Sequence, residues 1–240
     1  SSAASDVYKR QTKNGTIKKT CLEAYSRPRT NGVNAINIVE GDEVVDVRLT
    51  NGKNEIILAN RNGRAVRFDE NTVRAMGRVS TGVRGMQLDG DDDQVVGMII
   101  VNDAETETVM VVSENGYGKR SQVEDYRKTN RGGKGVKTFS ITEKTGRLVA
   151  IKNVTDDNDL MIINKSGIAI RLAVSDCRVM GRATQGVRLI NLSKKNDVIA
   201  SVCKVMSSEL EAKLADDNAS TESEATEATE ANEAKPENEK

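Results

Sequence analysis

Basic residues recur at fixed distances from a Gly-Val step, and this spacing is the feature of the sequence with the clearest chemistry. The step occurs four times. In its last three copies, arginine or lysine stands eight residues before the glycine, four residues before it and two residues after it. The positions are Arg74, Arg78, Arg84, Arg127, Arg131, Lys137, Arg178, Arg182 and Arg188. Regularly repeated cations of this kind suit a phosphate backbone.

Two landmarks keep one period of about 50 residues. The step glycines, spaced by 50, 53 and 51 residues, are Gly32, Gly82, Gly135 and Gly186. A turn glycine precedes each of them, at Gly15, Gly63, Gly116 and Gly167. A fourth basic column stands four residues after the turn glycine, at Lys19, Arg67, Arg120 and Arg171. We therefore expect four units within residues 12–206, namely 12–53, 54–105, 106–156 and 157–206.

Each unit has the pattern of about four short strands. Apolar runs at 55–60, 108–113 and 160–164 lead into the turn glycine, which follows asparagine in the first two cases and Ser166 in the third, and the Asn-Gly pairs suit a tight hairpin. This predicts an all-β fold of four-stranded, propeller-like blades. A two-sheet barrel is the alternative, although it does not require a strict period. In a propeller, equivalent positions lie on one ring, so the basic columns would form a curved belt.

The composition restricts the function. The chain has no histidine, and its three cysteines form no CxxC pair, so we expect no catalytic residue and no metal site. No run of 18 apolar residues and no leader of the secretory type is present, so we expect a cytoplasmic protein without a membrane span. The net charge of zero divides into +8 for residues 1–206 and −8 for residues 207–240. Such an asymmetry is typical of proteins that meet a polyanion.

The composition also restricts which kind of nucleic acid the basic columns could bind. The chain has no tryptophan, two phenylalanines and four tyrosines, too few for the stacking platforms of single-strand binders. No recognition helix is evident, which leaves duplex DNA bound through its phosphates and bent. Two alternatives remain open: a solvated face whose arginines pair with acidic neighbours, and a propeller that binds protein partners.

Both ends of the chain differ from the repeats. The opening "SSAASDVYKRQ" resembles a translated sequencing adapter, and we exclude residues 1–11 from the fold as a non-native leader. The tail, residues 207–240, is acidic and of low complexity, so we expect it to be disordered. The tail could also compete with DNA for the basic belt.

Several long phrases resemble one family in the right order. They are "NGTIKKT", "RAMGRVSTGVRGMQL", "ENGYGKRSQVEDY" and "VMGRATQGVRLI". From about Gln11 to Val205, the sequence resembles the C-terminal domain of the A subunit of bacterial DNA gyrase. The resemblance implies a β-pinwheel of six four-stranded blades with strands exchanged between neighbours, of which about four blades are present. It also implies that double-stranded DNA wraps around the rim and supports ATP-dependent negative supercoiling.

The resemblance implies partners outside this sequence: the rest of the gyrase A subunit, and the gyrase B subunit in a heterotetramer of two A and two B subunits. ATP and Mg would be bound elsewhere in that enzyme, with no cofactor in this segment. The domain that carries the DNA-cleaving tyrosine is absent from the sequence, so we expect no activity from the segment alone. The matching domain of the topoisomerase IV A subunit is the alternative within the family.

The family's signature box, Gln-Arg-Arg-Gly-Gly-Lys-Gly, does not occur. A box-like variant occurs in "TNRGGKG", where Thr129 and Asn130 do not match. The matching residues are Arg131, Gly132, Gly133, Lys134 and Gly135. We expect the nine residues of the three columns around the Gly-Val step, together with Lys134, to contact phosphates. Arg67, Arg120 and Arg171 form a second tier of expected contacts.

Overall fold

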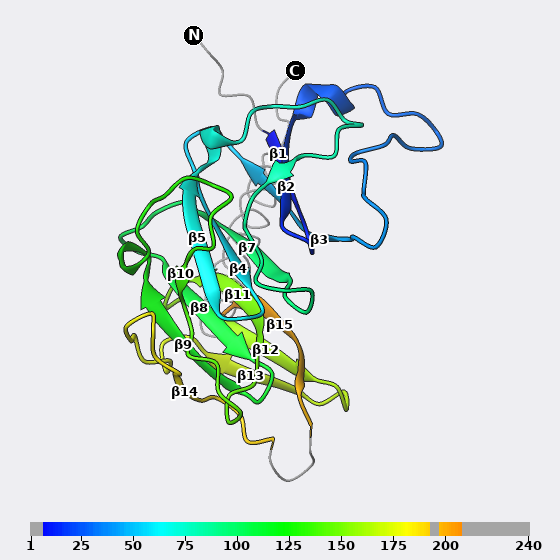
Figure 1. The fold of residues 1–240 in the computed structure, drawn as a ribbon. Helices are drawn as coiled ribbons and strands as arrows, with labels where there is room; N and C mark the ends of the chain where they lie inside the picture. The colour runs from blue at the N-terminus through cyan, green and yellow to red at the C-terminus, as the bar shows by residue number, and fades with distance from the viewer. Residues whose placement is uncertain (1–6, 193–196, 208–240) are drawn as a thin grey trace, which may run out of the picture.

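The computed structural model describes residues 7–192 and 197–207. In this range the chain is all-β, with four antiparallel sheets that follow one another from the top to the bottom of Figure 1. The predicted fold class is confirmed. No helix of the described ranges has the length and apolar character needed to cross a membrane.

The first three sheets have four strands each, and the fourth has three. The first sheet has the order β3 (Val44–Thr50), β1 (Val7–Thr12), β2 (Thr16–Cys21), β6 (Val83–Arg84). The second has the order β7 (Val95–Val101), β4 (Glu55–Asn60), β5 (Arg64–Asp69), β10 (Val136–Lys137). The third has the order β11 (Leu148–Val154), β8 (Thr108–Ser113), β9 (Tyr117–Gln122), β14 (Val187–Arg188). The fourth has the order β15 (Ile199–Met206), β12 (Asn158–Asn164), β13 (Ala169–Ala173).

The outermost strand of each four-stranded sheet comes from the following repeat. Strand β6 crosses back to β2, β10 crosses back to β5, and β14 crosses back to β9. Three short 3-10 helices, η1 (Leu22–Tyr25), η2 (Glu70–Thr72) and η3 (Val123–Asp125), follow the strands that receive this partner. Each of the first three sheets is therefore completed by a strand of the following repeat, which joins these repeats to one another.

The close approach of the crossing chain explains the repeated step glycine. Gly135 has a φ of +75°, and a Cβ on it would stand 2.2 Å from the carbonyl oxygen of Ala65. Gly186 is equivalent, with a φ of +69° and a Cβ position 2.4 Å from the oxygen of Gly118. Only glycine fits such a position without strain. Gly32 has open space instead, and Val33 lies in no strand, since no described sheet precedes the first.

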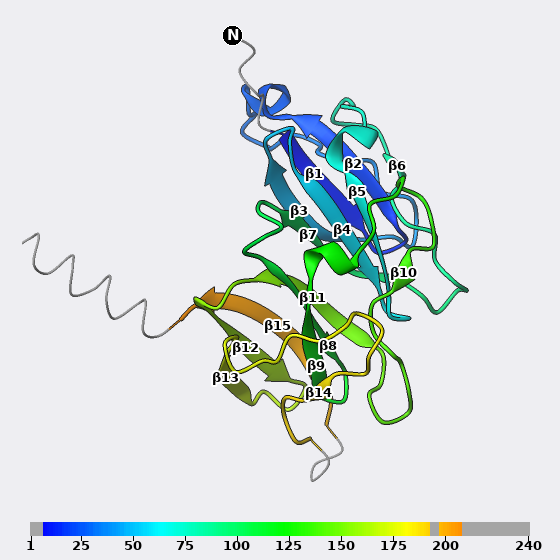
Figure 2. The ribbon, with the colours of Figure 1, turned by 90° about the vertical axis from the view of Figure 1, so that its left-hand side faces the viewer.

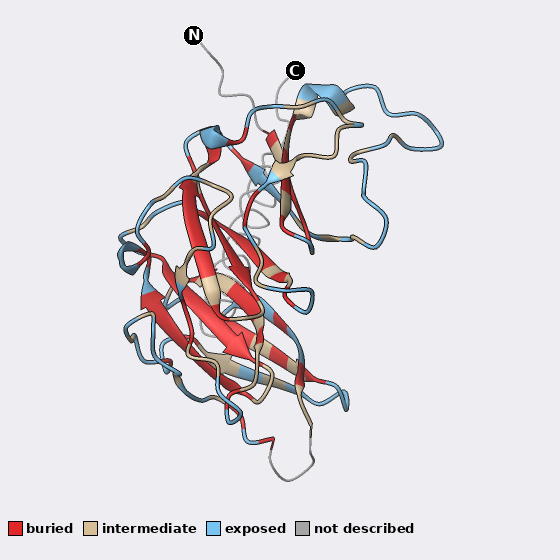
Figure 3. Cartoon of the chain, in the orientation of Figure 1, coloured by how far each residue is buried: buried red, intermediate tan, exposed pale blue. Residues whose placement is uncertain are grey.

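The core lies between the sheets. One cluster packs Ile17 of the first sheet against Ile56 and Leu58 of the second, and two further clusters join the second sheet to the third and the third to the fourth. The central strands of the two middle sheets, β4, β5, β8 and β9, are thus buried, as the red ribbons of Figure 3 show. The inner strands β3, β7, β11 and β15 lie next to one another in that order.

Residues 7–11 differ from our expectation. They form most of β1, the strand between β2 and β3, and Lys9 and Gln11 in it have no exposed surface. This strand ends three residues before the turn glycine, as do β4 and β8, because the hairpin needs a backbone partner there whatever the side chains are. The origin of residues 1–11 stays a prediction, with residues 1–6 outside the described part. The expected disordered tail also lies outside it, apart from Ser207.

Candidate nucleic-acid interface

Three basic residues lie on the strands that the repeats exchange. Arg84 on β6, Lys137 on β10 and Arg188 on β14 are exposed, and each stands on the outermost strand of its sheet. Figure 2 shows β6, β10 and β14 one after another along one side of the molecule. The column two residues after the step glycine therefore follows the outer rim of three successive sheets.

The loop before each exchanged strand also follows the rim. The amides of Met76, Thr129 and Met180 each donate to the strand below, to the oxygens of Lys19, Arg67 and Arg120, at 2.8 Å in all three cases. This brings a second exposed column, Arg74, Arg127 and Arg178, to the same outer edge. Two of the predicted columns are thus brought together on one surface.

These exposed cations have few intramolecular partners. Within residues 7–192 and 197–207, Arg74, Arg84, Arg127, Lys137 and Arg178 form no ion pair, and their charge is open to an external anion. Arg188 lies 5.8 Å from the ring centre of Tyr117 and donates from Nε to its hydroxyl over 3.3 Å.

Lys134 of the box-like loop is already engaged. Its ammonium lies 2.8 Å from a carboxylate oxygen of Asp89, and Arg64 lies 3.5 Å from the other oxygen. The hydrogen bond from Lys134 holds the pKa of Asp89 below its usual value. Lys134 remains exposed, so Asp89 and a phosphate would compete for it.

The column four residues before the step glycine is half-buried and joins neighbouring repeats. Arg131 donates from Nε to the oxygen of Thr72 and from a terminal nitrogen to the oxygen of Arg84, both over 2.9 Å. Arg182 makes the equivalent bonds to Asp125 and Lys137, over 2.9 and 2.6 Å. Arg78, in the same column, is also half-buried. This column orients the rim loops as well as contributing charge to them.

Two arginines of the second tier of expected phosphate contacts are buried. Arg67 and Arg120 are 7% and 9% exposed, and both reach into the next repeat. Arg67 donates to the oxygens of Val123 and Tyr126 and pairs with Glu124 at 3.0 Å. Arg120 donates to the oxygen of Cys177 over 2.6 Å and pairs with Asp156 at 2.6 Å. Their burial argues against contact with phosphate, and we leave them out of the interface.

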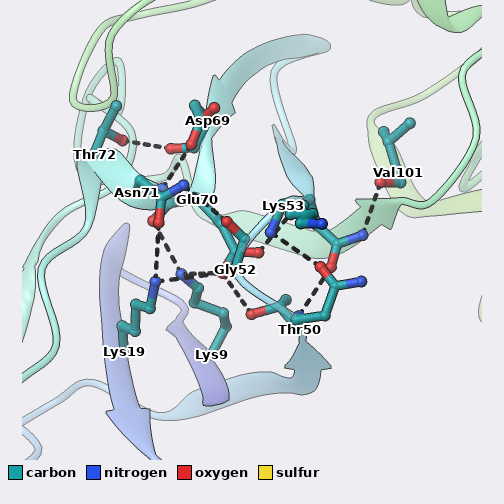
Figure 4. A network of polar contacts seen from close by, with 12 residues as sticks. Lys9, Lys19, Thr50, Gly52, Lys53, Asp69, Glu70, Asn71, Thr72 and Val101 are labelled. Carbon is teal, nitrogen blue, oxygen red and sulfur yellow. Dashed lines mark hydrogen bonds and ion pairs between the residues drawn. The ribbon is translucent and has the colours of Figure 1, made fainter. Parts of the chain in front are cut away.

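Arg171 and Lys19 complete that column. Arg171 lies on β13 with its Nε 2.7 Å from Asp159, and it bonds the oxygen of Met206. Lys19 points at Asn71 and at Glu70, whose carboxylate is 3.5 Å away, as Figure 4 shows. These two side chains also hold parts of the fold together.

Glu70 is the centre of the network in Figure 4, and sequence reasoning missed it. It has no exposed surface and accepts hydrogen bonds from Thr50 Oγ1 at 2.7 Å and from the amide of Asn54 at 2.9 Å. The ammonium of Lys9 lies 3.1 Å away. Burial alone would raise the pKa of Glu70, but these hydrogen bonds and the charge of Lys9 lower it. One feature of the sequence could have identified Glu70. It stands seven residues after its turn glycine, where the next two repeats have the apolar residues Val123 and Val174.

The site therefore offers cations and backbone groups along one edge, and this arrangement can hold a polyanion. Among the described residues, no three histidine, cysteine, aspartate or glutamate side chains gather as metal ligands.

Known proteins are similar to this chain in sequence and in fold. The model of a family described as "DNA gyrase C-terminal domain, beta-propeller" matches residues 11–51, 54–102, 107–155 and 158–203. The A subunit of DNA gyrase from Staphylococcus aureus (strain MRSA252) is 46% identical over 194 residues, which are 81% of this chain and 22% of that protein. The chain thus spans about a fifth of the length of the curated relatives that it matches.

Two solved structures are similar over most of the chain. A crystal structure of the C-terminal domain of DNA topoisomerase IV is 28% identical with a TM-score of 0.78, covering 84% of this chain and 62% of that one. A structure of a DNA gyrase A C-terminal domain is 25% identical with a TM-score of 0.75, covering 85% and 67%.

Proposed function

Because the chain belongs to the DNA gyrase C-terminal domain family, we propose that it binds duplex DNA along its outer rim and bends it. The observation that carries this proposal is the position of the two exposed basic columns on the exchanged strands and their loops. The five cations of these columns without an ion-pair partner follow the edge of three successive sheets within the described ranges. A bent duplex would meet them in turn, with phosphates as their counter-ions.

The interface that we propose consists of three groups. The exposed columns make direct phosphate contacts, Lys134 does so in competition with Asp89, and the half-buried column holds the loops in place. Backbone contacts of this kind give affinity with little reading of base sequence. The direct contacts come from Arg74, Arg84, Arg127, Lys134, Lys137, Arg178 and Arg188, and the loop-holding residues are Arg78, Arg131 and Arg182.

The wider role belongs to a longer protein. We propose that DNA held on this rim is presented to the rest of the gyrase A subunit and to the gyrase B subunit, in an assembly of two A and two B subunits. ATP-dependent negative supercoiling would be the activity of that whole enzyme in the bacterial cytoplasm. ATP and Mg would be bound outside this chain, which would have no catalytic activity alone.

A second candidate is the corresponding domain of topoisomerase IV, which decatenates DNA. The fit to such a domain, with a TM-score of 0.78, supports it as a fold relative, while the 46% identity to a gyrase protein favours gyrase. The full-length A subunit, assayed together with its B subunit on relaxed and on catenated plasmids, separates the two. Negative supercoiling supports gyrase, and decatenation without supercoiling supports topoisomerase IV.

The test of DNA binding is a salt series with a duplex of about 40 base pairs. The variant R84A/K137A/R188A removes three proposed phosphate contacts, so the slope of log K against log salt should become less steep by about 2.7. A matched control, K152A/K165A/K204A, removes the same charge on and beside the inner strands and should keep most of the slope. Equal effects of the two variants would contradict a rim interface.

A further inference from the structure

Two of the three rim loops have the same turn. In residues 77–80 and 181–184, the amide of the fourth residue donates to the oxygen of the glycine, over 3.2 Å in the first loop and 3.3 Å in the second. The hydroxyls of Ser80 and Thr184 donate to the same two oxygens, over 2.8 and 3.0 Å. The middle loop has the box-like sequence instead and carries its own lysine, Lys134.

A fully buried lysine lies beneath each of these two turns. Lys119 has no exposed surface and donates from Nζ to the oxygen of Gly181 over 2.9 Å and to Ser121 Oγ over 2.8 Å. Lys18 stands at the equivalent position and donates to the oxygens of Ala35 and Arg78. The middle repeat has Val66 at this position. Each rim loop thus has one lysine, supplied either from below or by the loop itself.

Neither buried lysine has a counter-ion in the described part of the chain. Lys119 is attracted by Asp125 of η3, without an ion pair, and is repelled by Arg182 of the loop. Lys18 is repelled by Arg10 of β1. Burial lowers the pKa of each ammonium to about 8. A buried and uncompensated charge is costly to a fold, so its retention calls for a use.

A hollow opens on the outer side of the second turn. It has a volume of about 280 Å³ and is lined by Asp125, Gly181, Arg182, Ala183 and Thr184. Lys119 holds the oxygen of Gly181 from the inner side of the same turn. With Arg182 and Lys119 against Asp125, the charge around the hollow is positive by one unit.

We propose that this hollow is a phosphate-binding subsite of the DNA path, and that Lys119 supplies its buried positive charge through the Gly181 turn. The inference rests on the proposed function and adds a specific anion position to it. Lys18, which donates to the oxygen of Arg78, has the same role in the turn of residues 77–80, whereas the exposed Lys134 of the middle loop meets a phosphate directly. Lys119 is thus a positioning residue that does not touch the DNA.

The subsite predicts that DNA binding takes up a proton. Above pH 8 the free protein loses the charge of Lys119, and a bound phosphate restores it because the charged form is then compensated. Tyr126, beside Ser121, stays neutral in this range because burial raises its pKa to about 12. If the bound form keeps its proton fully, one lysine lowers the affinity about eightfold between pH 7.5 and pH 9.

The experiment measures the affinity of the 240-residue chain for a duplex of about 40 base pairs at pH 7.5 and pH 9, at constant salt. K119M should lack this eightfold pH dependence, and it should bind more weakly than the wild type at both pH values, with a deficit about eightfold larger at pH 7.5 than at pH 9. K119Q keeps an amide donor for the Gly181 turn without a titrating group, and it should behave as K119M does. K137M removes an exposed rim lysine instead, so it should weaken binding while the contribution of Lys119 to the pH dependence remains.

The thermal stability of K119M separates this role from a structural one. A lysine that serves only the fold would make K119M less stable, whereas removal of an uncompensated charge should leave it as stable or more so. The same pH dependence in K119M and the wild type would overturn the subsite, as would an equal loss of affinity at both pH values. Absence of salt-dependent binding in the wild type would instead refute the proposed function.

Discussion

The basic residues of this chain form two regions with opposite surroundings. Arg67 and Arg120 lie between neighbouring repeats and donate to backbone oxygens and carboxylates there. Arg84, Lys137 and the arginines of the preceding loops lie on the outer strands without ion-pair partners in the described part of the chain. A guanidinium whose acceptors lie inside the protein contributes to stability, and one that meets only water can serve an external phosphate. The same residue type thus divides into fold and function by its partners.

Substitution of a buried arginine should change stability more than any other change considered for these two regions. R120M should lower the free energy of unfolding by about 2.5 kcal/mol, because the oxygen of the buried Cys177 loses its donor, whereas the exposed carboxylate of Asp156 returns to water. Urea denaturation measures this loss. R127M, an exposed arginine of the rim, is the control and should change stability by less than about 0.5 kcal/mol. A loss below about 1 kcal/mol for R120M would show that the buried column is dispensable for the fold.

Lys119 is an exception to the comparison, since it is buried without a counter-ion among the described residues. Its folded pKa of about 8 lies below the ordinary 10.5, so the folded state is penalised while the lysine is charged. The penalty is complete below pH 8 and disappears as the pH rises toward 10.5, so wild-type stability should rise in that window. Relative to K119M, the rise should be about 2 kcal/mol.

Denaturation curves of the two proteins at pH 7.5, 9 and 10 measure the difference. Because the other titrating groups are shared, the difference isolates Lys119. A constant difference over this range would mean that the lysine keeps its ordinary pKa in the fold.

The half-buried column, Arg78, Arg131 and Arg182, combines features of the two regions. R131A removes bonds to the oxygens of Thr72 and Arg84 and one rim charge. We expect a stability loss of about 1 kcal/mol and a salt slope less steep by about 0.9. Denaturation and a salt series on the same sample measure both. A change in stability alone would assign this column to the fold. A change in the salt slope alone would assign it to the DNA-binding rim.

The smallest effect concerns the competition at Lys134. D89N should release Lys134 and Arg64 from their carboxylate and tighten DNA binding severalfold at low salt, with a steeper salt slope. Stability should fall by no more than about 0.5 kcal/mol, because the ion pairs are largely exposed. Weaker binding by D89N would mean that Asp89 orients Lys134 toward DNA.

The period, the strands and the basic columns could be predicted because they follow from local chemistry. An Asn-Gly turn after an apolar run leaves few alternatives to a hairpin, and the repetition of both landmarks places the units. The position of β1 was missed because Lys9, Arg10 and Gln11 stand where β4 and β8 have apolar residues. The strand is imposed by pairing with β2 and β3, which the side chains do not reveal.

A four-unit β repeat with basic residues at equivalent positions can be derived from the amino-acid sequence, because the period and the turns depend on neighbouring residues. Which basic column serves the fold and which faces the solvent depends on how the repeats pack. The exchanged strands and their loops cover the outer side of β2, β5 and β9, so arginines on those strands are enclosed while arginines on the covering segments become the rim. Which arginines are enclosed depends on contacts between residues that are about 60 positions apart in the sequence, such as Arg120 and Cys177. No local sequence pattern contains these contacts.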